Sequence, residues 1–221
     1  MDIPILFEDD RLLLCVKPAG VLSEEGGLPG LLRASRGLDE VYCVHRLDKP
    51  AAGLMVYAKT KQAAAALSAQ IAAREFEKSY LAAVQGRPED AGVMRDLLYH
   101  DAAKNKSYVV RRQRRGVREA ELRYETVERG EELSLVRIAL QTGRSHQIRV
   151  QFASRGMPLA GDTRYGSGYR DCAVALWCER LRFRHPATGE RVAFTATPPA
   201  VRPWTAFKFT QREEQTCDTS K

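Results

Sequence analysis

Residues 45–59 decide the fold, and they read H-R-L-D-K-P-A-A-G-L-M-V-Y-A-K. This stretch places an acid, Asp48, between two cations, Arg46 and Lys49, just before an apolar run typical of a strand. Nearby opposite charges favour the ionised form of a carboxyl group, so we expect Asp48 to stay charged. A fixed, ionised carboxylate can act as a nucleophile or a base. The simpler alternative, which composition alone favours, is a loop aspartate that only caps its own turn.

A second polar stretch, T-G-R-S-H-Q-I-R, occupies residues 142–149, where a predicted strand leads into a predicted helix. Helix N-termini attract anions through free N–H groups and the helix dipole, and Arg144 and Arg149 add charge at that end. The turn-rich run at residues 156–166 is suited to form one wall of a cleft. The alternative is a solvated helix face in which His146 hydrogen-bonds to the backbone.

A third stretch, K-S-Y-L-A-A-V, begins at Lys78 and reads as a strand. Successive side chains of a strand point to opposite faces, so Lys78, Tyr80 and Ala82 share one face. A tyrosine in such a position packs in a core more often than it takes part in catalysis.

The remaining pattern predicts many strands, few helices and short loops. Alternating or apolar runs predict strands at residues 5–7, 12–16, 53–59, 76–84, 118–128, 133–141 and within 173–197. Helical patterns cover residues 28–35, 61–73 and 145–154, and the second is expected to present Ala65, Leu67, Ile71 and Ala72 on one side. This content favours an α+β domain on a mixed, largely antiparallel sheet. We expect one catalytic domain over residues 1–210 and a polar tail over residues 211–221.

Composition narrows the class of protein. The 221 residues are 44% hydrophobic and 29% charged, and no apolar run approaches the roughly 20 residues of a membrane span. The N-terminus lacks the basic flank and apolar stretch of a secretory signal, so we expect a cytoplasmic protein. The net charge of +7 suits a polyanionic partner, because neutralised phosphates release counterions. The most basic stretch comprises Lys104, Lys106, Arg111, Arg112, Arg114, Arg115 and Arg118.

Metal and cofactor chemistry has no support in the sequence. The five cysteines are scattered, odd in number and without the two-residue spacing of a zinc or redox motif, so we expect reduced thiols. The chain also lacks dinucleotide-binding glycines and a P-loop. We therefore expect no cofactor and no metal.

Together the three stretches resemble, in the same order, the motifs of RluA-like pseudouridine synthases, which isomerise uridine in RNA. That family has an H-R-L-D segment followed by a glycine and an aliphatic strand, then a Lys-x-Tyr strand and a T-G-R-x-H-Q-I-R run. Residues 17–20 (K-P-A-G) and parts of 176–186 also match, so the resemblance spans about residues 5–200. The chain departs from the pattern at Ala51 and Ala52, where the family usually has Thr-Ser.

The resemblance implies roles for individual residues. Asp48, Tyr80 and Arg144 are the expected catalytic residues. Asp48 is the catalytic aspartate, Tyr80 is the active-site tyrosine that stacks on the uracil or also moves a proton, and Arg144 pairs with the Asp48 carboxylate. Arg46 is placed to enter the RNA stack near the vacated base, and Leu159 packs near the site. Further contacts with substrate or RNA are expected from His45, Lys78, His146, Gln147, Arg149, Lys104, Lys106, Arg111, Arg112, Arg114 and Arg115.

The resemblance also implies a sheet with flanking helices and loops around a central RNA-binding cleft. The expected partner is structured RNA, ribosomal or transfer, without an obligate protein partner, and we expect a monomer. Many relatives carry a separate small RNA-binding domain, which we do not expect in this chain. RNA affinity is then expected from the catalytic domain itself, which favours residues 104–118 as an RNA surface. Two other functions stay open: a non-catalytic RNA-binding protein on the same scaffold, and a nucleoside hydrolase, although the paired carboxylates or metal-binding acidic cluster typical of hydrolases are not found.

Overall fold

A computed structural model describes residues 2–208 of the chain as an α+β fold. These residues form two compact units, one of residues 2–78 and 177–198 and one of residues 79–176 and 199–208. The expected single domain stays a prediction, and the expected tail at 211–221 lies outside the described residues. The longest helix within residues 2–208 has 13 residues, too few to cross a bilayer.

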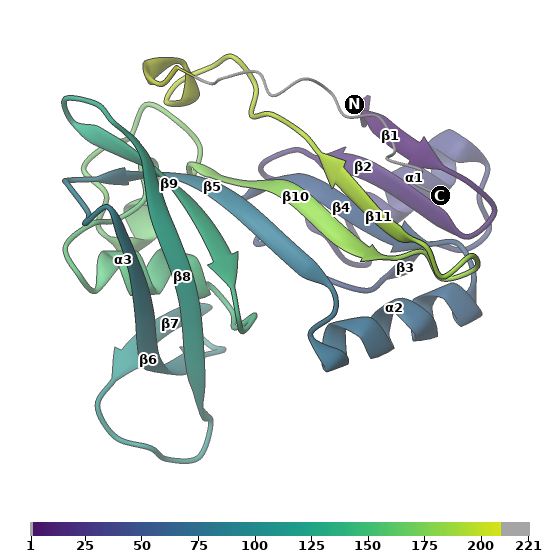
Figure 1. The fold of residues 1–221 in the computed structure, drawn as a ribbon, viewed down its shortest axis with the longest axis horizontal. Helices are drawn as coiled ribbons and strands as arrows, with labels where there is room; N and C mark the ends of the chain where they lie inside the picture. The colour runs from purple at the N-terminus through teal and green to yellow at the C-terminus, as the bar shows by residue number, and fades with distance from the viewer. Residues whose placement is uncertain (1, 209–221) are drawn as a thin grey trace. The chain divides into compact units, whose positions relative to one another are not determined.

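The first unit is built on strands that pair in the order β1-β2-β4-β10 (Figure 1). β3 pairs with β4, β11 pairs with β10, and every pairing is antiparallel except that of β4 with β10. The sheet is therefore mixed and largely antiparallel, as the sequence predicts. The strands are β1 (Ile5–Glu8), β2 (Leu12–Lys17), β3 (Tyr42–Cys43), β4 (Ala52–Ala58), β10 (Leu176–Arg184) and β11 (Arg191–Thr195).

Two helices complete this unit, α1 (Leu28–Arg36) and α2 (Lys61–Ala73), at the positions that the sequence predicts. The Thr60 side chain caps α2 by accepting a hydrogen bond from the Ala63 N–H. The buried stripe of α2 runs from Ala63 to Leu67 at four-residue spacing and contacts β4. The expected face was wrong in part, because Ala65 and Ala72 point away from that stripe and are exposed.

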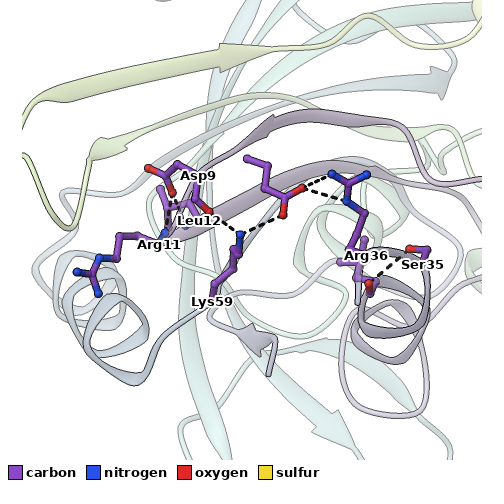
Figure 2. A network of polar contacts seen from close by, with 8 residues as sticks. Asp9, Arg11, Leu12, Ser35, Arg36 and Lys59 are labelled. Carbon is purple, nitrogen blue, oxygen red and sulfur yellow. Dashed lines mark hydrogen bonds and ion pairs between the residues drawn. The ribbon is translucent and has the colours of Figure 1, made fainter. Parts of the chain in front are cut away.

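The turn between β1 and β2 is fixed by an aspartate side chain (Figure 2). Asp9 Oδ1 accepts hydrogen bonds from the backbone N–H groups of Arg11 and Leu12, at 2.8 and 2.7 Å. Lys59 Nζ donates to the Asp9 carbonyl oxygen at 2.6 Å and so joins this turn to the end of β4. The side-chain turn explains why the acidic run at residues 8–10 separates two strands.

The second unit contains an antiparallel sheet in the order β5-β9-β8-β6-β7. Its β8–β9 hairpin confirms the prediction, whereas β6 was not anticipated. The elements are β5 (Glu77–Gln85), β6 (Ala91–Asp101), β7 (Lys106–Val110), β8 (Val117–Arg129), β9 (Leu133–Leu140), α3 (Gln147–Ala153) and two short 3-10 helices, Thr163–Tyr165 and Trp204–Ala206.

The helix α3 starts two residues later than the sequence predicts, and it lies in the interior. His146, at its N-cap, adopts the left-handed conformation with φ 55°, and residues 147–152 are all buried. The alternative of a solvated helix face is therefore wrong for α3. Gly156 follows the helix with φ 75°, the conformation expected of a terminating glycine.

Candidate active site

The loop that carries Asp48 is held from one side by a serine. Ser23 Oγ donates to the Leu47 carbonyl oxygen at 2.7 Å and accepts from the Leu47 N–H at 3.0 Å. The Tyr57 hydroxyl in turn donates to the Ser23 carbonyl oxygen at 2.8 Å. The residue before Asp48 is thus fixed by a buried hydroxyl that β4 itself positions.

A buried lysine holds the loop from the other side. Lys17 is fully buried at the end of β2, and its Nζ donates to the carbonyl oxygens of Pro18 (2.9 Å), Val21 (2.8 Å) and Lys49 (3.3 Å). The Gly20 N–H adds a bond to the Lys49 carbonyl at 2.8 Å. Burial lowers the pKa of Lys17 to about 8, although the negative charge of Asp48 acts in the opposite direction.

Asp48 itself is half-buried and opens a turn, in which its carbonyl oxygen accepts from the Ala51 N–H at 3.0 Å. Because both of its neighbours, Leu47 and Lys49, are anchored, the backbone at Asp48 is preorganised. Preorganisation of this kind is what a reacting carboxylate requires.

Gly53, at the start of β4, is required where β4 meets β10. Its φ is +113°, and a Cβ at this position would lie 2.4 Å from the backbone nitrogen of Cys178. A side chain here would push β10 away, which explains in physical terms why a glycine follows the aspartate at this spacing.

Three of the expected RNA-contacting residues in this unit differ in accessibility. Arg46 is 61% exposed and pairs with Glu24 at 2.9 Å, so it is available to a ligand. Lys78 is half-buried over the Phe76 ring, and burial lowers its pKa. His45 is buried, and its Nε2 accepts from the Val56 N–H at 3.2 Å, which gives it a structural role, while its expected RNA contact stays a prediction.

In the second unit, a glutamine side chain holds the loop that carries Arg144. Gln147 Oε1 accepts from the Thr142 hydroxyl (2.8 Å) and the Arg144 N–H (3.0 Å), while its Nε2 donates to the Glu121 carbonyl (3.1 Å). The Arg144 side chain is exposed, and its Nε donates to the Glu119 carbonyl at 3.0 Å. The buried amide of Gln147 is thus engaged in holding this loop, and its expected RNA contact stays a prediction.

Arg149 is also buried, and its expected contact with RNA stays a prediction. Its guanidinium is 3% exposed and forms a two-point ion pair with Asp162, at 2.6 and 2.9 Å. The Asp162 side chain is 1% exposed, so the two charges compensate each other in the interior.

Tyr165, whose role the sequence did not reveal, connects three segments of the second unit. Its hydroxyl oxygen accepts from the Ser107 N–H at 2.8 Å and lies 2.8 Å from His146 Nδ1. Ser107 Oγ donates to the Ser145 carbonyl at 2.6 Å. The tyrosine thereby links β7, beside the basic residues, to the loop that carries Arg144. The one sequence feature that pointed to this region was the turn-rich run of residues 156–166, which contains Tyr165.

Tyr80 and Leu159 are interior residues of this unit. Tyr80 is 4% exposed on β5, opposite Ile138 of β9, and Leu159 is fully buried beside Val84. Asp48 belongs to the first unit and Tyr80 and Arg144 to the second, and the expected Asp48–Arg144 ion pair stays a prediction.

The basic stretch of residues 104–118 lies on β7, on the start of β8 and in the adjoining loops. Lys106 packs over the rings of Tyr108 and Tyr165, at 5.7 and 5.4 Å from their centroids. Arg114 lies 4.9 Å from the Tyr99 centroid. The exposed members are Lys104, Arg111, Arg112, Arg114, Arg115 and Arg118.

Comparison with known proteins decides the family. Residues 11–154 match the family model described as RNA pseudouridylate synthase. The chain belongs to this family. Membership confirms the resemblance seen in the three motifs, and Asp48 and Arg144 both lie within the matched residues.

Curated members of the pseudouridylate synthase family include two similar relatives. The chain is 34% identical over 216 residues to ribosomal large subunit pseudouridine synthase D of Nitrosomonas europaea, covering 88% of this chain and 62% of the relative. It is 32% identical over 213 residues to the uncharacterized RNA pseudouridine synthase YhcT of Bacillus subtilis, covering 90% and 70%. The chain thus spans about two thirds of the length of these synthases.

Solved structures support the same fold. Human RNA pseudouridylate synthase domain containing 1 aligns with a TM-score of 0.78 at 22% identity, covering 90% of this chain and 85% of the other. Human RNA pseudouridylate synthase domain containing 4 aligns with a TM-score of 0.75 at 24% identity, covering 92% and 90%. The expected α+β pseudouridine synthase fold is confirmed.

Proposed function

We propose that the chain is an RNA pseudouridine synthase in which Asp48 is the catalytic residue. The observation that carries the proposal is the anchoring of the Asp48 loop from both sides, by Ser23 at Leu47 and by Lys17 at Lys49. A carboxylate that only capped a turn would not need this support from two other segments. Membership of the family supplies the reaction.

The proposed reaction breaks the N1–C1′ bond of uridine, turns the uracil and joins C5 to C1′. The nucleotide must first leave its stack, which costs a few kcal/mol. Tyr80 recovers part of that cost by stacking on the base, at about 1–3 kcal/mol. Asp48 then either attacks the substrate or removes a ribose proton, and both routes need an ionised carboxylate, which the resemblance pairs with Arg144.

Structured RNA is the proposed substrate, with ribosomal RNA favoured over transfer RNA by the names of relatives such as the Nitrosomonas europaea enzyme. The basic stretch of residues 104–118 is the proposed surface for the RNA backbone, because its exposed arginines and lysine suit phosphate. Arg46, exposed near Asp48, is the proposed residue that enters the stack.

Release of tritium from RNA labelled at C5 of uridine tests this function, because isomerisation frees the C5 hydrogen. The wild-type chain should release tritium, and Asp48→Asn should bind the same RNA without releasing any. The matched control is Asp39→Asn, which changes an exposed acid in the same unit and should leave turnover unchanged. Tritium release by pure Asp48→Asn protein would refute the role of Asp48.

RNA binding and analysis of the released products, beside tritium release, separate the two alternative functions. A non-catalytic RNA-binding protein would bind without tritium release from wild-type protein, and a hydrolase would yield free uracil. Tyr80→Phe separates two roles of the tyrosine: stacking predicts that binding and much activity persist. A collapse in rate at unchanged affinity would point to the hydroxyl as a proton carrier.

A further inference from the structure

The strands β10 and β11 form an antiparallel hairpin (Figure 1). Its two faces carry side chains of different character. On one face, Leu181 and Phe183 are buried, and Phe183 stacks with Phe76 at a centroid distance of 5.1 Å. Phe194 of β11 lies 5.9 Å from Phe183 and extends this apolar layer. This face anchors the hairpin to the core of the first unit.

The opposite face carries arginines at alternate positions. Residues two apart on a strand share a face, so Arg180, Arg182 and Arg184 lie in one row. The neighbouring strand adds Arg191 to the same face, directly across from Arg184. Arg182, Arg184 and Arg191 are exposed, and Arg180 is partly exposed.

These four arginines have little compensation from acids. Arg182 pairs with Glu77, and the carboxylate oxygen lies 3.9 Å from its guanidinium group, at the outer limit of an ion pair. The Arg184 side chain donates a long bond, 3.3 Å, to the Gly189 carbonyl, and its backbone N–H donates to Gln70 Oε1 at 2.7 Å. The row therefore keeps its guanidinium groups available to a ligand.

The placement of Arg184 opposite Arg191 disfavours the hairpin. Like charges directly across an antiparallel pair are destabilising, and an acid at either position would stabilise the two strands. Stability of the fold does not explain this arrangement, whereas a polyanion bound across both strands would.

We propose that the outer face of the β10–β11 hairpin, formed by Arg180, Arg182, Arg184 and Arg191, binds the sugar–phosphate backbone of the RNA. Alternate residues of a strand recur about every 6.6 Å, which gives a regular row of cations. The guanidinium fork binds phosphate oxygens in two-point contacts. The surface rests on the proposed function, because it takes the same RNA as its ligand, and it belongs to a different unit from residues 104–118.

The test compares two double variants of equal charge. Arg184→Gln/Arg191→Gln removes the facing pair, and Arg11→Gln/Lys61→Gln removes two exposed cations elsewhere in the same unit. Affinity for a long structured RNA that wild-type protein isomerises is measured from about 50 to 200 mM salt. The logarithm of the association constant falls linearly with the logarithm of the salt concentration. Arg184→Gln/Arg191→Gln, which loses two phosphate contacts, should reduce the size of this slope by about one to two, and the control variant should keep the wild-type slope.

Thermal unfolding gives a second readout. Relief of the like-charge pair predicts that Arg184→Gln/Arg191→Gln unfolds at the same temperature as wild type or slightly higher, which a purely structural role for the arginines would not allow. If Arg184→Gln/Arg191→Gln keeps the wild-type salt slope, the proposal is overturned, because the RNA backbone then does not contact this face. Failure of wild-type protein to isomerise any RNA would instead refute the proposed function, so the two failures are distinguishable.

Discussion

The ammonium group of Lys17 lies 3.3 Å from the carbonyl oxygen of Lys49, the residue that follows Asp48. The same group binds two carbonyl oxygens of its own loop, at Pro18 and Val21. A single buried cation thus joins the K-P-A-G loop to the proposed catalytic loop. The arrangement makes the position of Asp48 depend on a residue about thirty positions earlier in the chain.

Lys17→Met should weaken both stability and turnover. The substitution keeps the apolar stem but removes the ammonium donor from the Pro18 and Val21 carbonyl oxygens, and it leaves the Lys49 carbonyl with the Gly20 N–H alone. The loss of a donor to a buried group costs about 1–3 kcal/mol of unfolding free energy. Turnover in a single-turnover assay should fall more than RNA affinity, because the loop position is lost. Urea unfolding and filter binding measure the two effects. Lys61→Met, at an exposed position, should stay within about 0.5 kcal/mol of wild type.

The pH dependence of Lys17 should act on stability and activity in opposite directions. Burial lowers its pKa from 10.5 to about 8, so between these values the unfolded chain binds a proton that the folded chain has lost. Stability therefore rises with pH in this window, by at most about 1.4 kcal/mol per pH unit. Turnover should fall above about pH 8, because a neutral amine has two N–H groups for three carbonyls and no charge beside Asp48.

The other titratable groups contribute equally to wild type and Lys17→Met. The difference in unfolding free energy between the two proteins therefore reports the titration of Lys17. That difference should grow in favour of wild type from about pH 8 to 9.5, and should be constant below about pH 7. A difference that is flat over the whole range would show that Lys17 does not titrate there.

Gln147→Leu should impair the loop that carries Arg144. The change removes the acceptor of two hydrogen bonds, from Thr142 and the Arg144 N–H, and the donor to Glu121. We expect a loss of about 1–3 kcal/mol in unfolding free energy and a fall in kcat that exceeds any rise in KM. Steady-state kinetics at several RNA concentrations measure the split. An unchanged kcat would argue against a role for this loop in turnover.

The sequence predicted correctly those helices and strands whose buried residues follow the regular apolar spacing of the element. The helix α2 has the predicted bounds, since its cap and good helix formers are contiguous in sequence. The strand β6 was missed because it buries mainly Met94 and Leu98, four residues apart, and so lacks a strand alternation. It forms a strand because it pairs with β7 on one side and β8 on the other, and its own sequence pattern does not indicate this.

The candidate site shows a similar limit. Asp48 and its motif were recognisable from contiguous residues, whereas Gln147 and Arg149 were expected at the RNA and lie in the interior. Each is buried with a specific partner, and the acid that pairs with Arg149 comes thirteen residues later. A sequence does not reveal such compensation, so polar residues in a motif are assigned to the ligand by default. The role of Lys17 was hidden for the same reason.

Gly53→Ala should be among the most damaging single substitutions. A methyl group would lie 2.4 Å from the Cys178 nitrogen, and φ of +113° is unfavourable for alanine. We expect a loss of at least about 3 kcal/mol from the combined strain and overlap. Gly37→Ala is the matched control, because it shares a positive φ, +63°, but has open space around its Cβ. It should lose only about 1–2 kcal/mol.

Tyr165→Phe tests whether the basic β7 strand and the Arg144 loop act together. The hydroxyl accepts from the Ser107 N–H, so its own proton is available to His146 Nδ1, and the substitution removes both bonds while keeping the ring beside Arg149. The loss of a half-buried acceptor predicts a decrease of about 1 kcal/mol in unfolding free energy. Because Ser107 follows Lys106, we also expect a higher KM for RNA.

The matched control for this change is Tyr108→Phe. Tyr108 lies on the same strand and is 36% exposed, so loss of its hydroxyl should alter stability by less than about 0.5 kcal/mol. Urea unfolding and steady-state kinetics on one RNA compare the two variants. Equal behaviour of the two phenylalanine variants would mean that the Ser107–Tyr165–His146 contacts do not couple the strand to the loop. A rise in KM confined to Tyr165→Phe would support a shared position for both elements, since only that variant removes the link between them.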